Sequence, residues 1–66
     1  MKAYLVERPV SGWCQDYAMV IIAKDERHAE RKARVSSDDF KKRQEITVTE
    51  IDMNEEQCVF TANTGA

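Results

Sequence analysis

The order of hydrophobic and polar positions predicts a β-strand at the start of the chain. Residues 2–8 are mostly apolar, with Ala3 and Leu5 at one parity and Tyr4 and Val6 at the other. Successive side chains of a strand point to opposite faces of its sheet. Each face of this first strand would therefore carry apolar side chains.

A second strand is predicted over residues 17–24, which read "YAMVIIAK". The segment combines aromatic and β-branched residues and is apolar at both parities, a pattern typical of strands. Continuous apolar runs are characteristic of strands that are covered on both faces. We therefore expect residues 17–24 to form a central strand of the sheet.

The pattern then becomes helical. Asp25 can accept a hydrogen bond as an N-cap, and Glu26 in the first turn suits the positive end of the helix dipole. The helix should run to about Val35. Its inward-facing candidates are Ala29 and Ala33, four residues apart, with Val35 near the end.

The remainder of the chain predicts two more strands. Phe40 is expected to reach the core from the connection after the helix. Residues 45–53 read as a third strand, and a change in the parity of its apolar positions suggests a bulge near Glu50. Residues 54–57 resemble a hairpin turn, and residues 58–62 a fourth strand.

These elements give an α+β fold in the order β-β-α-β-β, with one helix packed on a small, mostly antiparallel four-stranded sheet. The 66 residues fit a single domain, residues 1–66, whose core must be thin. No apolar run approaches the roughly 20 residues of a membrane span. We therefore expect a cytoplasmic protein that does not enter the membrane.

Residue types typical of catalysis are sparse. His28 is the single histidine, and a general base needs a positioned partner and a substrate pocket. Cys14 and Cys58 are far apart in the sequence, and with His28 they do not form the paired spacing of a zinc site. We expect reduced thiols, an exposed His28, and no enzymatic activity, metal or cofactor.

Charge is distributed unevenly along the chain. Residues 27–43 hold seven basic and three acidic residues, whereas residues 44–66 hold five acidic residues and no basic one. The basic stripe could follow nucleic-acid phosphates, or Glu26 and Glu30 could neutralise it at helical spacings. The candidate nucleic-acid contacts are Arg27, Arg31, Arg34, Lys41, Lys42 and Arg43.

One helix can cover only one face of the sheet. If Val20 and Ile22 face the helix together with Leu5, an aromatic and apolar patch is left on the other face, and such patches commonly mark interfaces. Trp13 in the adjacent loop would anchor a partner there. A two-fold homodimer could instead form through Tyr4, Val6, Tyr17 and Met19. The expected partner-binding residues are Tyr4, Val6, Trp13, Tyr17 and Met19.

Three segments, "YAMVIIAKD", "ERHAERKA" and "ITVTEIDM", followed by "VF" and Gly65, resemble small proteins encoded by phages and prophages. These proteins include anti-CRISPR inhibitors and other anti-defence factors. The resemblance implies a non-catalytic protein that binds and inhibits or redirects a host protein complex. The alternatives are a nucleic-acid-binding accessory protein that uses the basic residues, and a self-associating structural accessory protein.

Overall fold

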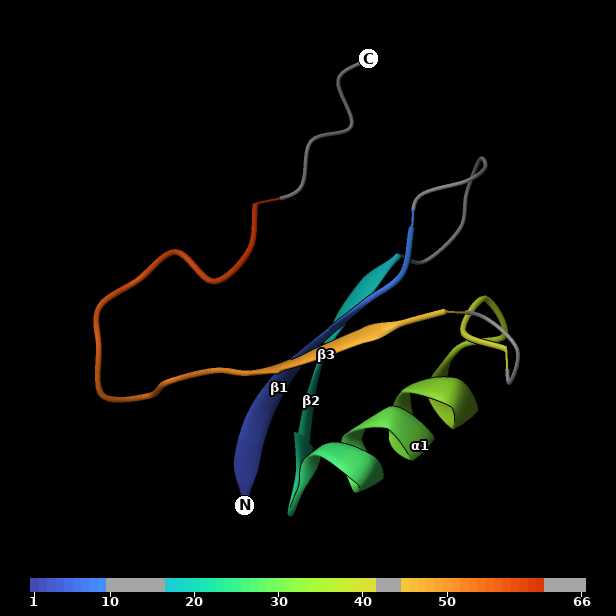
Figure 1. Cartoon of the computed structure of the whole chain (residues 1–66), viewed down its shortest axis with the longest axis horizontal. Helices are drawn as coiled ribbons and strands as arrows, with labels where there is room; N and C mark the ends of the chain where they lie inside the picture. The colour runs from blue at the N-terminus through green and yellow to red at the C-terminus, as the bar shows by residue number, and fades with distance from the viewer. Residues whose placement is uncertain (10–16, 42–44, 62–66) are drawn as a thin grey trace.

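The computed structural model describes residues 1–9, 17–41 and 45–61. It contains one helix and three strands, drawn in Figure 1: β1 (Lys2–Glu7), β2 (Ala18–Ala23), α1 (Glu26–Ser36) and β3 (Thr47–Glu50). The first two strands and the helix lie close to their predicted positions, and the third strand lies within residues 45–53 but is shorter than predicted. The fold is a small α+β structure.

The three strands form one antiparallel sheet in the order β2-β1-β3. In the centre of the register, Val6 on β1 lies opposite Met19 on β2 and Val48 on β3. Because both outer strands run antiparallel to β1, they are parallel to each other, and α1 lies in the connection between them. The prediction of β2 as a central strand is wrong: β1 is central, and β2 lies at an edge.

The predicted four-stranded sheet is also wrong, because the described part of residues 58–62 contains no strand. After β3, residues 51–61 form what we call the arm, which includes a turn at Met53 and Asn54. Figure 1 shows the arm on the side of the sheet away from α1.

Local hydrogen bonds explain why the chain leaves the sheet after β3. The Asp52 carboxylate accepts from the Asn54 backbone N–H at 2.9 Å, and the Asp52 carbonyl accepts from Gln57 Nε2 at 2.6 Å. These bonds close a turn that directs the chain away from β1. Glu50 lies in regular register opposite Tyr4, so the change of parity marks the end of the strand and the predicted bulge is wrong.

Helix α1 forms for the local reasons that the sequence indicates. Asp25 is the N-cap, and its side chain accepts from the His28 backbone N–H at 2.9 Å. Ala29 and Ala33 are fully buried against the sheet. Val35 is 81% exposed, against the expectation, because it lies two residues beyond Ala33 and therefore about half a turn round the helix.

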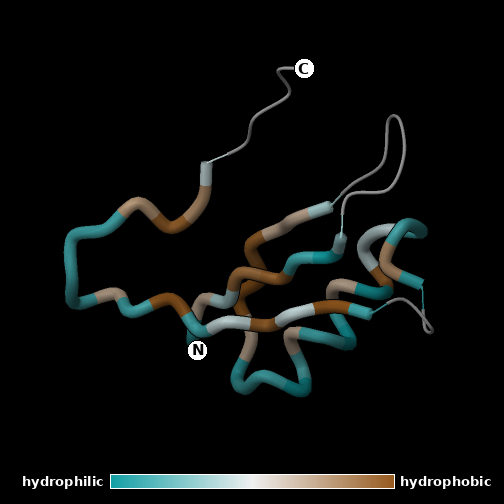
Figure 2. Tube along the Cα trace, turned by 45° about the horizontal axis from the view of Figure 1, so that its top comes forward, coloured by the Kyte–Doolittle hydropathy of each residue, from teal (hydrophilic) through white to brown (hydrophobic). Residues whose placement is uncertain are grey.

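The core lies between α1 and one face of the sheet. Phe40 is completely buried, which confirms that the connection after α1 contributes to the core. Figure 2 shows hydrophobic parts of β1 and β2 in the interior and hydrophilic residues along much of α1. The buried cluster consists of Tyr4, Val6, Ile21, Ala23, Ala29, Ala33 and Phe40, with Met19, Ile46 and Val48 partly buried against it.

The helix covers the sheet face opposite to the expected one. Tyr4 and Val6 are buried beneath it, whereas Val20 and Ile22 are 58% and 59% exposed. The position of Ala23 fits this orientation. Since α1 begins soon after β2 ends, a small side chain at Ala23 allows the first helical turn to approach the sheet closely.

Candidate functional site

Strand β2 has an edge that no strand in the described part of the chain occupies. Outside the strand, the Arg8 backbone N–H donates to the Tyr17 carbonyl at 2.9 Å. Hydrogen-bonded positions alternate along an antiparallel pair. The backbone N–H and C=O groups of Ala18, Val20 and Ile22 therefore point away from β1. We call this row of groups the open β2 edge.

Large apolar side chains lie beside this edge. Val20 and Ile22 project from the sheet face opposite α1, and each is more than half exposed. Met1, which is 92% exposed, lines the same hollow as Ile22. We call Met1, Val20 and Ile22 the β2 patch. An apolar patch next to unpaired strand groups is a typical interaction surface.

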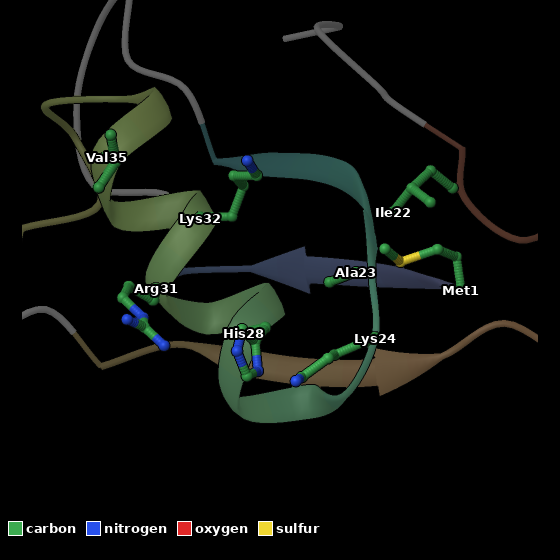
Figure 3. Close-up of a pocket in the computed structure, with 8 residues that line it drawn as sticks. All are labelled: Met1, Ile22, Ala23, Lys24, His28, Arg31, Lys32 and Val35. Atoms are coloured by element: carbon green, nitrogen blue, oxygen red, sulfur yellow. The ribbon is translucent and has the colours of Figure 1, made fainter.

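A groove of about 490 Å³ lies between the end of β2 and α1. Figure 3 shows side chains from the helix on one side of it and Ile22 and Met1 on the other. Its lining residues are Met1, Ile22, Ala23, Lys24, His28, Arg31, Lys32 and Val35. None of these residues carries a carboxylate, so this β2 groove combines an apolar floor with a cationic rim.

His28 at this groove is tied to the helix cap. Its Nδ1 lies 2.8 Å from Asp25 Oδ1, the same oxygen that accepts from the His28 backbone N–H. That backbone hydrogen bond, together with the ring contact, lowers the pKa of Asp25 below its usual value. The pair thus completes the N-terminus of α1. The residues that line the groove include no Ser, Thr, Cys or Tyr.

Part of the predicted basic stripe contacts acidic or backbone groups. Arg34 Nε lies 3.5 Å from Glu30 Oε2, and Arg34 also donates to the Lys41 carbonyl. Arg27 lines a separate hollow with Glu26 and Glu30, next to Ile46 and Val48 near β3. On the β3 side of α1, basic and acidic side chains are therefore mixed.

The β2 side of α1 has a different charge. Arg31 and Lys32 line the β2 groove together with Lys24 from the end of β2. Lys42 and Arg43 lie outside the described residues. The structure thus places Arg31 at a groove with Lys24 and Lys32, two lysines outside the predicted set, while Arg27 and Arg34 remain its neighbours on the helix surface at i−4 and i+3.

The predicted partner-binding residues of the two strands lie on the covered face. Tyr4 and Val6 belong to the core, and Met19 is partly buried against it. The orientation with Val20 and Ile22 toward the helix, on which the predicted partner surface depended, is wrong, because both side chains are exposed. The small residue Ala23 could have indicated the correct face, because it lies where the chain turns into the helix. Ile21 and Met19 share its parity and therefore also lie under the helix.

Tyr17 and the arm meet at the far end of β2. The Tyr17 and Phe60 ring centroids are 6.0 Å apart, so the arm returns to contact the sheet region. Trp13, the predicted anchor, lies outside the described residues. Tyr17 is half-buried, and its ring is already in contact with Phe60 of the same chain.

Among the described residues, no group of three or more His, Cys, Asp or Glu side chains could hold a metal ion. Cys58 is an exposed free thiol, and Cys14 lies outside the described residues. The one described helix lacks the length and apolar composition needed to cross a membrane.

Comparisons with protein-family models, curated proteins and solved structures give no match to this chain. The resemblance to small phage proteins therefore stays a prediction from the sequence. The features of the molecule that bear on function are the open β2 edge, the β2 patch and the β2 groove.

Proposed function

We propose that this chain is a non-catalytic protein-binding module that contacts its partner through β2. The observation that carries the proposal is the exposure of Val20 and Ile22 on an edge strand. Monomeric proteins protect such strands with charges, with short edges or with covering segments. Here two β-branched side chains lie in solvent beside backbone groups that can still form hydrogen bonds.

Burial of the β2 patch would contribute usefully to binding. Full burial of a Val or Ile side chain is worth roughly 1.5–3 kcal/mol. Since Val20 and Ile22 are each a little more than half exposed, covering both would supply about 2–3 kcal/mol in total. A partner that also paired with the edge would satisfy the outward N–H and C=O groups.

The resemblance to small phage proteins suggests the consequence of such binding. A module of this kind would inhibit or redirect a host protein complex by occupying one of its surfaces. This action requires a shaped apolar surface and no reacting groups. The β2 patch and edge supply such a surface.

Affinity capture from bacterial lysate with matched variants tests the proposal. We expect a polypeptide captured by the unmodified chain to be lost with Val20→Asp and with Ile22→Asp. It should be retained with Met53→Asp, because Met53 is an exposed apolar residue, at 76%, that lies on the arm and not on β2. Circular dichroism of each variant verifies that the fold is kept. Capture that survives both β2 substitutions would contradict the proposal.

A further inference from the structure

We infer that the partner supplies an extended segment that joins the open β2 edge as an additional strand, with apolar and acidic residues in alternation. This inference rests on the proposed function and specifies the chemistry of the partner. Two observations carry it: the backbone N–H and C=O groups of β2 point outward, and β2 has an apolar side and a cationic side.

The backbone of β2 is suited to strand addition. Ala18, Val20 and Ile22 present outward N–H and C=O groups in the spacing of a sheet ladder. Peptides that add to a sheet edge gain affinity from these main-chain hydrogen bonds and specificity from alternate side chains. The edge thus determines an extended conformation for the bound segment.

The two sides of β2 determine the side chains of that segment. Side chains that project away from α1 would lie beside Val20 and Ile22, which favours apolar residues. Side chains that project toward α1 would lie at the β2 groove, beside Arg31 and Lys32. Acidic residues complement these cations, and no carboxylate among the lining residues competes with them.

A second copy of the chain fits this edge less well. Two-fold antiparallel pairing of β2 with another β2 would place both α1 helices on the same side of the joined sheet. The cationic rims of the two β2 grooves would then lie on the same side of the joined sheet, and like charges brought close together are destabilising. A nucleic acid could contact these cations but would leave Val20 and Ile22 uncovered. The observations therefore favour an acidic protein segment.

Hydrogen exchange measured by NMR tests strand addition directly. The probe is a short blocked peptide in which valine and glutamate alternate, and its control replaces glutamate by lysine. We expect the glutamate peptide to slow exchange of the Val20 and Ile22 amides, whose N–H groups it would occupy. The lysine peptide should leave their exchange unchanged. Equal protection by both peptides, or protection by neither, would overturn the inference.

Charge reversal on α1 and just beyond it provides the second test. Lys32→Glu should weaken binding of the glutamate peptide by about tenfold, since a repulsion replaces an attraction in the groove. Lys41→Glu changes the net charge equally at an exposed position that does not line the groove. It should leave the affinity within about twofold. Equal losses with both variants would indicate a general charge effect and contradict the inference.

Two further outcomes identify a different occupant. Sedimentation that shows a dimer dissociated by Val20→Asp would mean that a second copy covers the edge, and would overturn the inference. Tight duplex DNA binding with a steep salt dependence, lost with Lys32→Glu, would assign the groove to nucleic acid. If the peptide fails while capture from lysate still requires Val20 and Ile22, the proposed function stands and strand addition is wrong.

Discussion

Three valines allow the same substitution to be made at three levels of burial. Val6 is completely buried in the core, Val20 is 58% exposed on β2, and Val35 is 81% exposed on α1. Replacing each by alanine removes identical atoms, so differences in the free energy of unfolding report the surroundings. The series therefore tests which face of the sheet α1 covers.

The expected magnitudes follow from burial. Val→Ala removes the equivalent of two methylene groups, each worth about 0.8 kcal/mol when fully buried. Val6→Ala should therefore cost roughly 1.5–2.5 kcal/mol once a residual cavity is included. Val20→Ala should cost about 0.7 kcal/mol, because less than half of the side chain is buried. Val35→Ala should be neutral or stabilising by up to about 0.5 kcal/mol, since alanine favours the helix.

Urea unfolding followed by circular dichroism measures these differences. A 66-residue chain should have a total stability of about 3–10 kcal/mol, so the Val6→Ala loss is a large fraction of it. The slope of the unfolding free energy against urea concentration should be the same for all variants, because the same surface is exposed on unfolding. A larger loss at Val20 than at Val6 would refute the assigned faces and restore the orientation predicted from the sequence.

Three further outcomes are expected. Phe40→Ala should cost about 3–5 kcal/mol and leave much of the chain unfolded by circular dichroism, whereas Phe40→Leu should keep the fold. The pKa of Asp25 is lowered in the folded state, so its stabilisation is present above its unfolded value and is lost as pH falls through its folded value. Urea midpoints from about pH 5 to pH 2 should therefore decline less for Asp25→Ser, which keeps a capping oxygen. A double-mutant cycle on Glu30 and Arg34 should give roughly 0.3–0.5 kcal/mol, decreasing with added salt; a salt-independent value would contradict their ion pairing.

The helix could be predicted from the sequence because its determinants are local. The Asp25 cap and the four-residue spacing of Ala29 and Ala33 act within a few residues of chain. The burial of Phe40 could also be predicted locally, because it is a large aromatic residue in an otherwise polar connection. Local determinants of this kind do not depend on which strands pair.

The order and number of strands depend on distant residues. The apolar run in β2 is consistent with a buried central strand, yet β1 takes the centre because it pairs with both β2 and β3. The segment around Val59 has strand-like composition, but the turn at Asp52 directs it away from β1. Composition shows what a strand can bury, while pairing determines what it does bury.

The candidate site depended on the orientation of β2, which hydrophobicity alone does not determine. Both parities of β2 are apolar, so Val20 and Ile22 suit the core about as well as Met19 and Ile21. The charge near one end of β2 could have been predicted more easily. Helical spacing places His28, Lys32 and Val35 on one side of α1, and Lys24 immediately follows β2.

If β2 binds an acidic segment as proposed, the cations beside it would also limit association of this edge with a second copy of the chain. An exposed strand with large apolar side chains is a template for aggregation, and lysines are a common protection against it. Lys24, Arg31 and Lys32 would repel the same residues of a second copy and would attract a segment of opposite charge. A basic partner would be repelled by the same cations that keep a second copy away. An acidic partner would be attracted by these cations while a second copy is still repelled. The charge of the groove therefore constrains the composition of the partner more strongly than the apolar patch does.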